Sequence, residues 1–208
     1  MNGKTHDHAR RKTLVLCALV LLLSCLSASA AAQQLQVTLD PSQTRIEWTL
    51  GDVLHTVHGT FKLRAGQISV DPNTGLANGE FVVDASSGDS GNSMRDNKMN
   101  KDVLQSKLYP EITFLPKKVL GRVSEHGSST VQVQGVFHIH GADHEMTLSV
   151  PLQTTGNQVK ASTSFTVPYQ AWGMKNPSTL FLRVDDKVQI NINTVGKLTA
   201  SGVAQADQ

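Results

Sequence analysis

The chain has 208 residues, enough for one ordinary domain. Its net charge is +2, but residues 1–32 hold four of the 19 basic and one of the 17 acidic side chains, so the remainder has 15 against 16 and a net charge of −1. A near-neutral remainder gives no electrostatic reason to expect nucleic acid or an anionic membrane surface as a partner. Both cysteines, Cys17 and Cys25, lie within residues 1–32, which excludes disulfides, thiol catalysis and cysteine metal sites from the rest.

The first 32 residues have the pattern of a secretory signal peptide. A short polar stretch ends in Arg10, Arg11 and Lys12, an almost unbroken apolar run follows from Thr13 to Leu26, and small residues stand at 28–30. The apolar run has about 14 residues, short of the ~20 that span a bilayer, so an uncleaved anchor is the weaker interpretation. Two further alternatives stay open: a lipoprotein acylated at Cys25, and a twin-arginine signal at Arg10 and Arg11.

This interpretation divides the chain into three parts. We expect a signal peptide at 1–32, one barrel domain at 33–200 and a polar tail at 201–208 that frays. Cleavage would place the protein in the periplasm or outside the cell, with a lipoprotein anchored at Cys25 as the alternative.

Beyond residue 32, apolar and polar residues alternate in many short runs. Alternation with period two is typical of strands that have one dry and one wet face. Turn-forming residues such as Asn78-Gly79 and Gly141-Ala142-Asp143 separate the runs. Many short strands at this spacing predict an all-β sandwich or barrel. In chain order, the clearest runs are 46–50, 61–63, 112–114, 131–133, 137–140, 146–150 and 188–193.

One stretch breaks the period. Residues 93–107 read SMRDNKMNKDVLQSK, with no alternation and with apolar residues that share a short helical face. We predict a connection with one or two helical turns, which ends before Tyr109-Pro110.

A barrel of about eight strands has an interior wide enough for side chains or for one small ligand. The alternation is compatible with both a packed core and a lined cavity. An apolar interior without a polar cluster would suit an extended apolar molecule.

Three segments resemble the YceI family of small bacterial proteins. They are residues 39–61, which include His58-Gly59-Thr60-Phe61; RDNKMNKDVLQSKLYPEITF at 95–114; and GVFHIHGADHEMTLSVPL at 135–152. The second segment is the most specific, and the resemblance covers roughly residues 37–193. It implies an eight-stranded antiparallel, lipocalin-like barrel with a long central pocket for a polyisoprenoid, quinone-like or fatty amphiphile.

The resemblance and the alternation together place twelve residues on the inner face, where we expect them to bind ligand. They are Ile46, Trp48, Leu50, Phe61, Leu63, Phe81, Ile112, Phe114, Phe137, Ile139, Met146 and Leu148. Trp48 and Trp172 stand where the family more often has smaller aromatics, which leaves the size of the ligand open.

Several polar residues resemble catalytic or metal sites. His138, His140 and His144 could be metal ligands, but Phe137 and Ile139 point inward, so we expect His138 and His140 to face solvent and no metal to bind. For Arg95 and Asp96 we expect a structural role, with Asp96 accepting backbone N–H groups and Arg95 bridging to a carboxylate.

Four serines, Ser86, Ser87, Ser90 and Ser93, lie in a polar region without the frame of a serine hydrolase. We therefore predict no catalytic residue, no cofactor and no enzymatic activity.

The leading hypothesis is an exported, non-enzymatic carrier of a polyisoprenoid or other long-chain lipid. The alternatives are an enzyme that acts on such a lipid, and a structural or stress-protective barrel with a packed core. Proximity to a membrane and formation of a homodimer stay open.

Overall fold

The computed structural model describes residues 34–51, 56–124, 126–178 and 183–201. The predicted signal peptide, with Cys25, and nearly all of the predicted polar tail lie outside these residues. Within the described ranges, no helix has the length and apolar character needed to cross a membrane.

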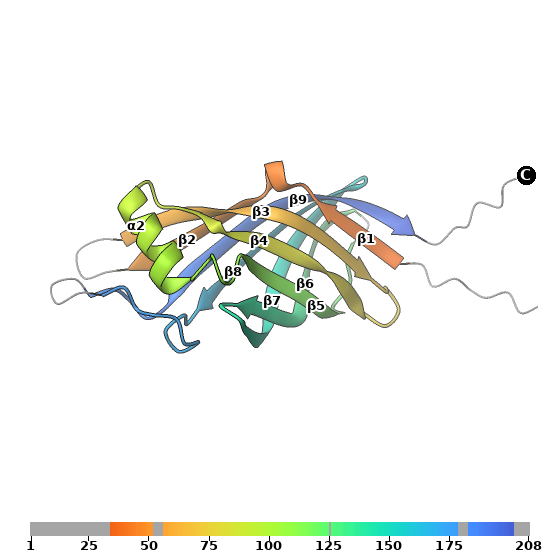
Figure 1. Cartoon of the computed structure of the whole chain (residues 1–208). Helices are drawn as coiled ribbons and strands as arrows, with labels where there is room; N and C mark the ends of the chain where they lie inside the picture. Colours follow the sequence, from red (N-terminus) through yellow and green to blue (C-terminus); the bar gives the residue numbers. More distant parts are fainter. Residues whose placement is uncertain (1–33, 52–55, 125, 179–182, 202–208) are drawn as a thin grey trace, which may run out of the picture. The chain divides into compact units, whose positions relative to one another are not determined.

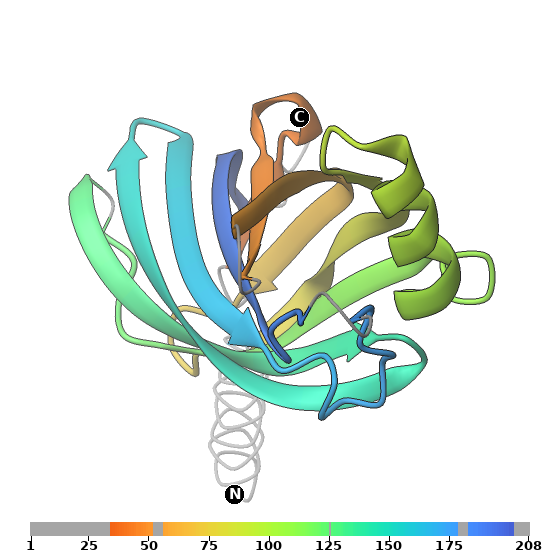
Figure 2. The same cartoon turned by 90° about the vertical axis from the view of Figure 1, so that its left-hand side faces the viewer.

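The described chain forms a closed antiparallel barrel of β-strands (Figures 1 and 2). The strands are β1 (Gln34–Leu39), β2 (Arg45–Gly51), β3 (Thr56–Val70), β4 (Ala77–Asp89), β5 (Glu111–Leu120), β6 (Gly127–Ile139), β7 (Ala142–Thr155), β8 (Gln158–Val167) and β9 (Val188–Ser201). From β2 to β9 each strand pairs with the next in the chain, β9 pairs back onto β2, and β1 pairs with β3 and β9.

Nine strands occupy only eight positions, because β1 and β2 share one. Both lie between β3 and β9, but β2 pairs with residues 189–193 of β9 and β1 with residues 196–201. A 3₁₀ turn, η1 (Pro41–Gln43), separates them, and the Asp40 side chain caps it by accepting the Ser42 N–H at 2.8 Å. Pro41 has no N–H to give to a ladder, so the strand is interrupted there. The predicted eight-stranded antiparallel barrel is confirmed.

The predicted helical connection is also confirmed. It consists of α2 (Ser93–Lys98) and the π-helical turn η2 (Met99–Val103). Asn92 begins the helix, and its side-chain oxygen accepts the N–H groups of Met94 and Arg95. No residue of α2 is buried, whereas Val103 and Leu104 at the end of η2 lie in the hydrophobic core.

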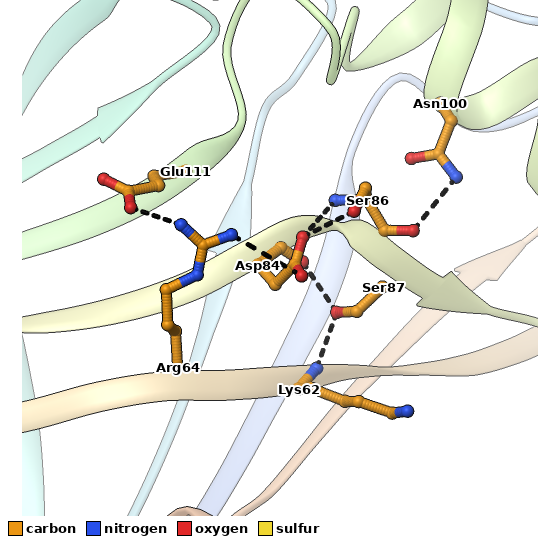
Figure 3. Close-up of polar contacts among 7 residues, drawn as sticks. All are labelled: Lys62, Arg64, Asp84, Ser86, Ser87, Asn100 and Glu111. Carbon is orange, nitrogen blue, oxygen red and sulfur yellow. Dashed lines mark hydrogen bonds and ion pairs between the residues drawn. The ribbon is translucent and has the colours of Figure 1, made fainter.

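A bulge where β4 leaves the ladder makes room for this connection (Figure 3). The register with β3 jumps from Lys62↔Asp84 to Thr60↔Asp89, so four residues of β4 have no direct partner on β3. Within the bulge, the hydroxyl of Ser87 takes the place of a backbone hydrogen bond between the strands. It accepts the Lys62 N–H at 2.8 Å and donates to the Asp84 carbonyl at 2.6 Å.

On the outer face beside the bulge, Asp84 is at the centre of a polar network (Figure 3). Its carboxylate accepts the backbone N–H and the hydroxyl of Ser86, and Arg64 lies 3.6 Å away while also pairing with Glu111 at 2.5 Å. The hydrogen bonds from Ser86, supported by the Arg64 charge, hold the pKa of Asp84 below its ordinary value. Folding therefore favours the ionised carboxylate.

We predict that Asp84→Asn lowers the free energy of unfolding at pH 7 by less than about 1 kcal/mol, since the network is partly exposed. The contribution of a carboxylate with a lowered pKa is present above its unfolded pKa of about 3.9 and is lost as the pH falls through the folded value. The difference between variant and native protein should therefore shrink in urea titrations between pH 5 and about pH 3. Glu80→Gln, which removes the same charge from an exposed position of β4, is the control; an equal effect there would contradict the role of Asp84.

Candidate ligand-binding site

The barrel encloses a cavity of about 660 Å³. All nine described strands contribute side chains to its lining, and these are almost wholly apolar. The volume lies within the range of about 300–1,000 Å³ typical of small-molecule sites. Of the two arrangements that the alternation allowed, a packed core and a lined cavity, the structure has the cavity.

Ten of the twelve residues predicted for the inner face line this cavity. They are Ile46, Trp48, Leu50, Phe61, Phe81, Ile112, Phe114, Phe137, Ile139 and Leu148. Their place follows from the period of the strands, since alternate residues of a closed sheet share its inner face. Contact of these side chains with a ligand remains a prediction.

Leu63 is buried but does not line the cavity. The register between β3 and β4 shifts at Leu63/Ala65, and beyond this shift the lining residues of β3 are Ile68 and Val70. A bulge changes which residues share a face. Leu63 still lies opposite Val83, a lining residue, and packs into the core cluster around the cavity, so its place on the inner face is as predicted although its side chain does not reach the cavity.

Met146 is partly buried and is also absent from the lining. Its partner across the ladder is Gly135, and a Cβ on Gly135 would lie only 2.6 Å from the Phe114 ring. The ring thus lies over the glycine, beside Met146. Met146 shares the inward parity of Leu148 on β7, as predicted, but an aromatic side chain from β5 lines the cavity in its place.

The prediction missed lining residues outside the clearest strands. Val37 and Leu39 of β1 lie in an alternating run and could have been found by the same rule. Met99, Val103 and Leu104 come from the connection, where alternation is absent. Tyr169 and Met174 come from the irregular segment between β8 and β9, for which no periodic signal exists.

The segment between β8 and β9 is attached to the barrel by aromatic contacts. Trp172 stacks on His144 of β7 with ring centroids 3.8 Å apart, and it also lies 5.9 Å from Phe137. Phe137 in turn meets Phe165 edge to face at 5.9 Å. Tyr169 donates its hydroxyl to the Asp185 carbonyl at 2.5 Å, and burial raises its pKa to about 12. These contacts hold Tyr169 and Met174 in the wall of the cavity.

The histidines of β6, of β7 and of the turn between them make separate contacts. His138 faces outward and pairs with Asp143 at 2.6 Å, as its position in the alternation predicted. The prediction that His140 faces solvent is wrong. Its side chain is partly buried, with the ring 4.9 Å from that of Tyr109, because the chain turns at His140 with a φ of 53°. Among the described residues, no group of three or more His, Cys, Asp or Glu side chains could hold a metal ion.

Arg95 and Asp96 both bind Ser90. Asp96 accepts the Ser90 N–H at 3.0 Å and its hydroxyl, in line with the predicted role for this carboxylate. Arg95 was predicted to bridge to a carboxylate; among the described residues it instead donates to the Ser90 hydroxyl at 2.7 Å and to the Ser90 carbonyl at 2.9 Å. The pair pins α2 to the end of β4.

The sequence matches the YceI-like domain over residues 37–196, more than half of the chain. The chain belongs to the YceI-like family. No curated protein matches it, but several solved structures share the fold of this YceI-like barrel.

Three of these structures illustrate the likeness. BcnA of Burkholderia cenocepacia has a TM-score of 0.63 at 20% identity, with 76% of this chain and 98% of that one covered. A polyisoprenoid binding domain from Saccharophagus degradans has a TM-score of 0.62 at 12% identity, covering 78% and 98%. The YCEI protein of Campylobacter jejuni has a TM-score of 0.55 at 19% identity, covering 72% and 88%.

The mouth of the YceI-like cavity can be located from exposure. Of the described residues that line it, the exposed ones are Asn92, Met94, Arg95 and Lys98, all on α2 or at its cap. Every other described lining residue is buried or partly buried. The cavity therefore reaches the surface beside α2.

The stack of His144 on Trp172 should make stability depend on pH. Burial lowers the pKa of His144, against an opposing effect of the Asp143 charge. A histidine with a lowered folded pKa disfavours protonation, so its contribution is present at high pH and is lost as the pH falls below its unfolded value of about 6.5.

We therefore predict that His144→Phe, which keeps a stacking ring but cannot titrate, has a melting temperature that falls less between pH 7.5 and pH 5 than that of the native protein. Thermal unfolding across this range measures the difference. His126→Gln, at an exposed position, should keep the native pH profile. A parallel fall in the native protein and in His144→Phe would contradict the role given to the stack.

Proposed function

We propose that the protein is an exported, non-enzymatic carrier that holds a polyisoprenoid, quinone-like or fatty amphiphile inside its barrel. The observation that carries the proposal is a continuous apolar cavity of about 660 Å³ that reaches the surface at one polar lip. Each methylene that leaves water for such a cavity gains about 0.8 kcal/mol, so a long tail would bind inside while a polar head stays at the lip.

The titratable side chains of the lining favour a carrier over an enzyme. Among the described residues they are Arg95 and Lys98, both exposed at the mouth, and Tyr169. Tyr169 keeps its proton, because its pKa is raised to about 12 and its hydroxyl donates to a carbonyl. An enzyme that moves protons needs a group poised near neutral pH and within reach of its substrate. The described lining offers no such group, which supports a carrier.

The comparisons support the class of ligand. One protein with the same fold is named as a polyisoprenoid binding domain, and it aligns over 98% of its own length. A branched, flexible isoprenoid suits a lining of aliphatic and aromatic side chains.

We propose that the carrier acts in the periplasm or outside the cell. The charged start, short apolar run and small residues of 1–32 support cleavage of a signal peptide, and acylation of Cys25 is the alternative. The mass of the N-terminal peptide from cell envelope and medium fractions distinguishes these, since an acylated Cys25 adds the mass of its lipid.

The decisive experiment is extraction of detergent-free protein with organic solvent, followed by mass spectrometry. A stoichiometric isoprenoid, quinone or fatty species would support the proposal and identify the ligand. An extract without lipid, combined with no binding on reconstitution, would contradict it and favour a structural or stress-protective barrel.

We predict that Phe114→Arg abolishes this co-purification, because a guanidinium in the apolar cavity costs several kcal/mol of desolvation that a lipid tail cannot offset. Phe114→Leu, which stays apolar, should retain lipid. Phe114→Arg also destabilises the folded protein, so Ala161→Phe serves as a second variant. It fills part of the cavity without adding charge and should reduce the amount of bound lipid. Unchanged lipid in both Phe114→Arg and Ala161→Phe would place the ligand elsewhere.

A further inference from the structure

The mouth of the cavity lies beside α2, at the end of the barrel that faces the viewer in Figure 2. Asn92, Met94, Arg95 and Lys98 line the cavity and are exposed, a combination found nowhere else in the described lining. A ligand that enters or leaves there passes α2. The surface of the 92–108 connection is therefore the surface that a donor or acceptor of ligand would meet.

This connection presents apolar side chains to water. Met94 is 79% exposed and Leu108 is 70% exposed, the two highest values among the large hydrophobic residues that the structure describes as exposed. Single exposed apolar residues are common on protein surfaces. Both lie on the connection whose helix borders the mouth.

The exposed charged side chains of the same connection are basic. Arg95, Lys98, Lys101 and Lys107 are all exposed. The two acidic residues, Asp96 and Asp102, are partly buried and already engaged, Asp96 with Ser90 and Asp102 with Lys98 at 3.5 Å. The net charge of −1 for residues 33–208 hides this local excess.

We propose that the 92–108 connection docks on an anionic lipid bilayer, so that a ligand passes between bilayer and cavity without crossing water. The inference rests on the proposed function, because it concerns how an apolar ligand reaches the site. Every methylene exposed to water costs free energy, so direct contact between mouth and bilayer removes a barrier to transfer. Lysine and arginine close to an anionic leaflet are attracted to it, and exposed apolar residues insert into its interface.

The test is co-sedimentation with vesicles of phosphatidylcholine, with and without an equal share of phosphatidylglycerol. The native protein should bind the anionic vesicles, and less so as salt is raised. Lys101→Glu/Lys107→Glu should weaken this binding about tenfold or more; neither residue lines the cavity.

The matched control is Lys117→Glu/Lys118→Glu. It makes the same change in net charge at exposed positions of β5, near a rival set of exposed leucines: Leu76, Leu115 and Leu120. Binding close to the native level is expected for this control. The apolar run of residues 1–32 could itself bind vesicles, but it is the same in every variant. The difference in binding between the two double variants therefore tests the docking surface.

Equal binding by the two double variants would overturn the proposal, and so would a loss confined to Lys117→Glu/Lys118→Glu, which would assign docking to β5. Binding of the C20 alcohol geranylgeraniol in solution, followed by tryptophan fluorescence, tests the proposed function separately. Lys101→Glu/Lys107→Glu should bind it like the native protein. Failure of the native protein and of every variant to bind this probe would contradict the carrier hypothesis. The vesicle experiment would still decide whether the 92–108 connection docks on the bilayer.

Discussion

Closure of the barrel depends on β9, which pairs with two strands in succession along one side. Its first half meets β2 and its second half meets β1, and the kink between them must fit without opening the ladder. Leu39 lies at this kink over two glycines: a Cβ on Gly66 of β3 would come 2.7 Å from the Leu39 side chain, and one on Gly196 of β9 would come 2.9 Å from it. The two glycines leave the volume that Leu39 fills, so the broken strand still closes the ring.

The cavity follows from this closure. A closed sheet has no free edge, and its alternating residues all face one enclosed space. At the end away from α2, the lining consists of small branched side chains, with Val70, Val119 and Val131 in a second cluster of their own. Near α2 the bulge in β4 brings Gly88 under Met99 and Phe61, where any Cβ would overlap both. The connection can therefore lie close to the rim, and the two ends of the barrel differ.

Period-two alternation predicted most of this architecture because it reports directly on which face of a strand is dry. It placed Leu63 and Met146 on the inner face but not their depth: neither lines the cavity, because Leu63 lies beside a register shift and Met146 is paired with a glycine covered by a ring from another strand. Neither feature has a local signature in sequence, since each depends on how one strand pairs with another. The stack of Trp172 on His144 is of the same kind: 28 positions separate the two residues, and no periodic pattern links them. The identity of Arg95's partner was missed because the nearest acceptors were a hydroxyl and a carbonyl of Ser90, whereas charge alone suggested a carboxylate.

An almost wholly apolar lining also constrains how ligands are distinguished. Discrimination by hydrogen bonds requires buried donors or acceptors that a wrong ligand leaves unpaired. Within the described lining, the hydroxyl of Thr194 is already bonded to Thr44 and that of Tyr169 to Asp185, whereas the buried indole N–H of Trp48 has no hydrogen-bond partner within the described chain. Apart from this one donor, what remains is the fit of volume and shape, in which each additional methylene contributes a nearly constant increment until the cavity is full. On the proposed function, the length of the tail would then set affinity inside the barrel, while the groups around α2 would act on the head.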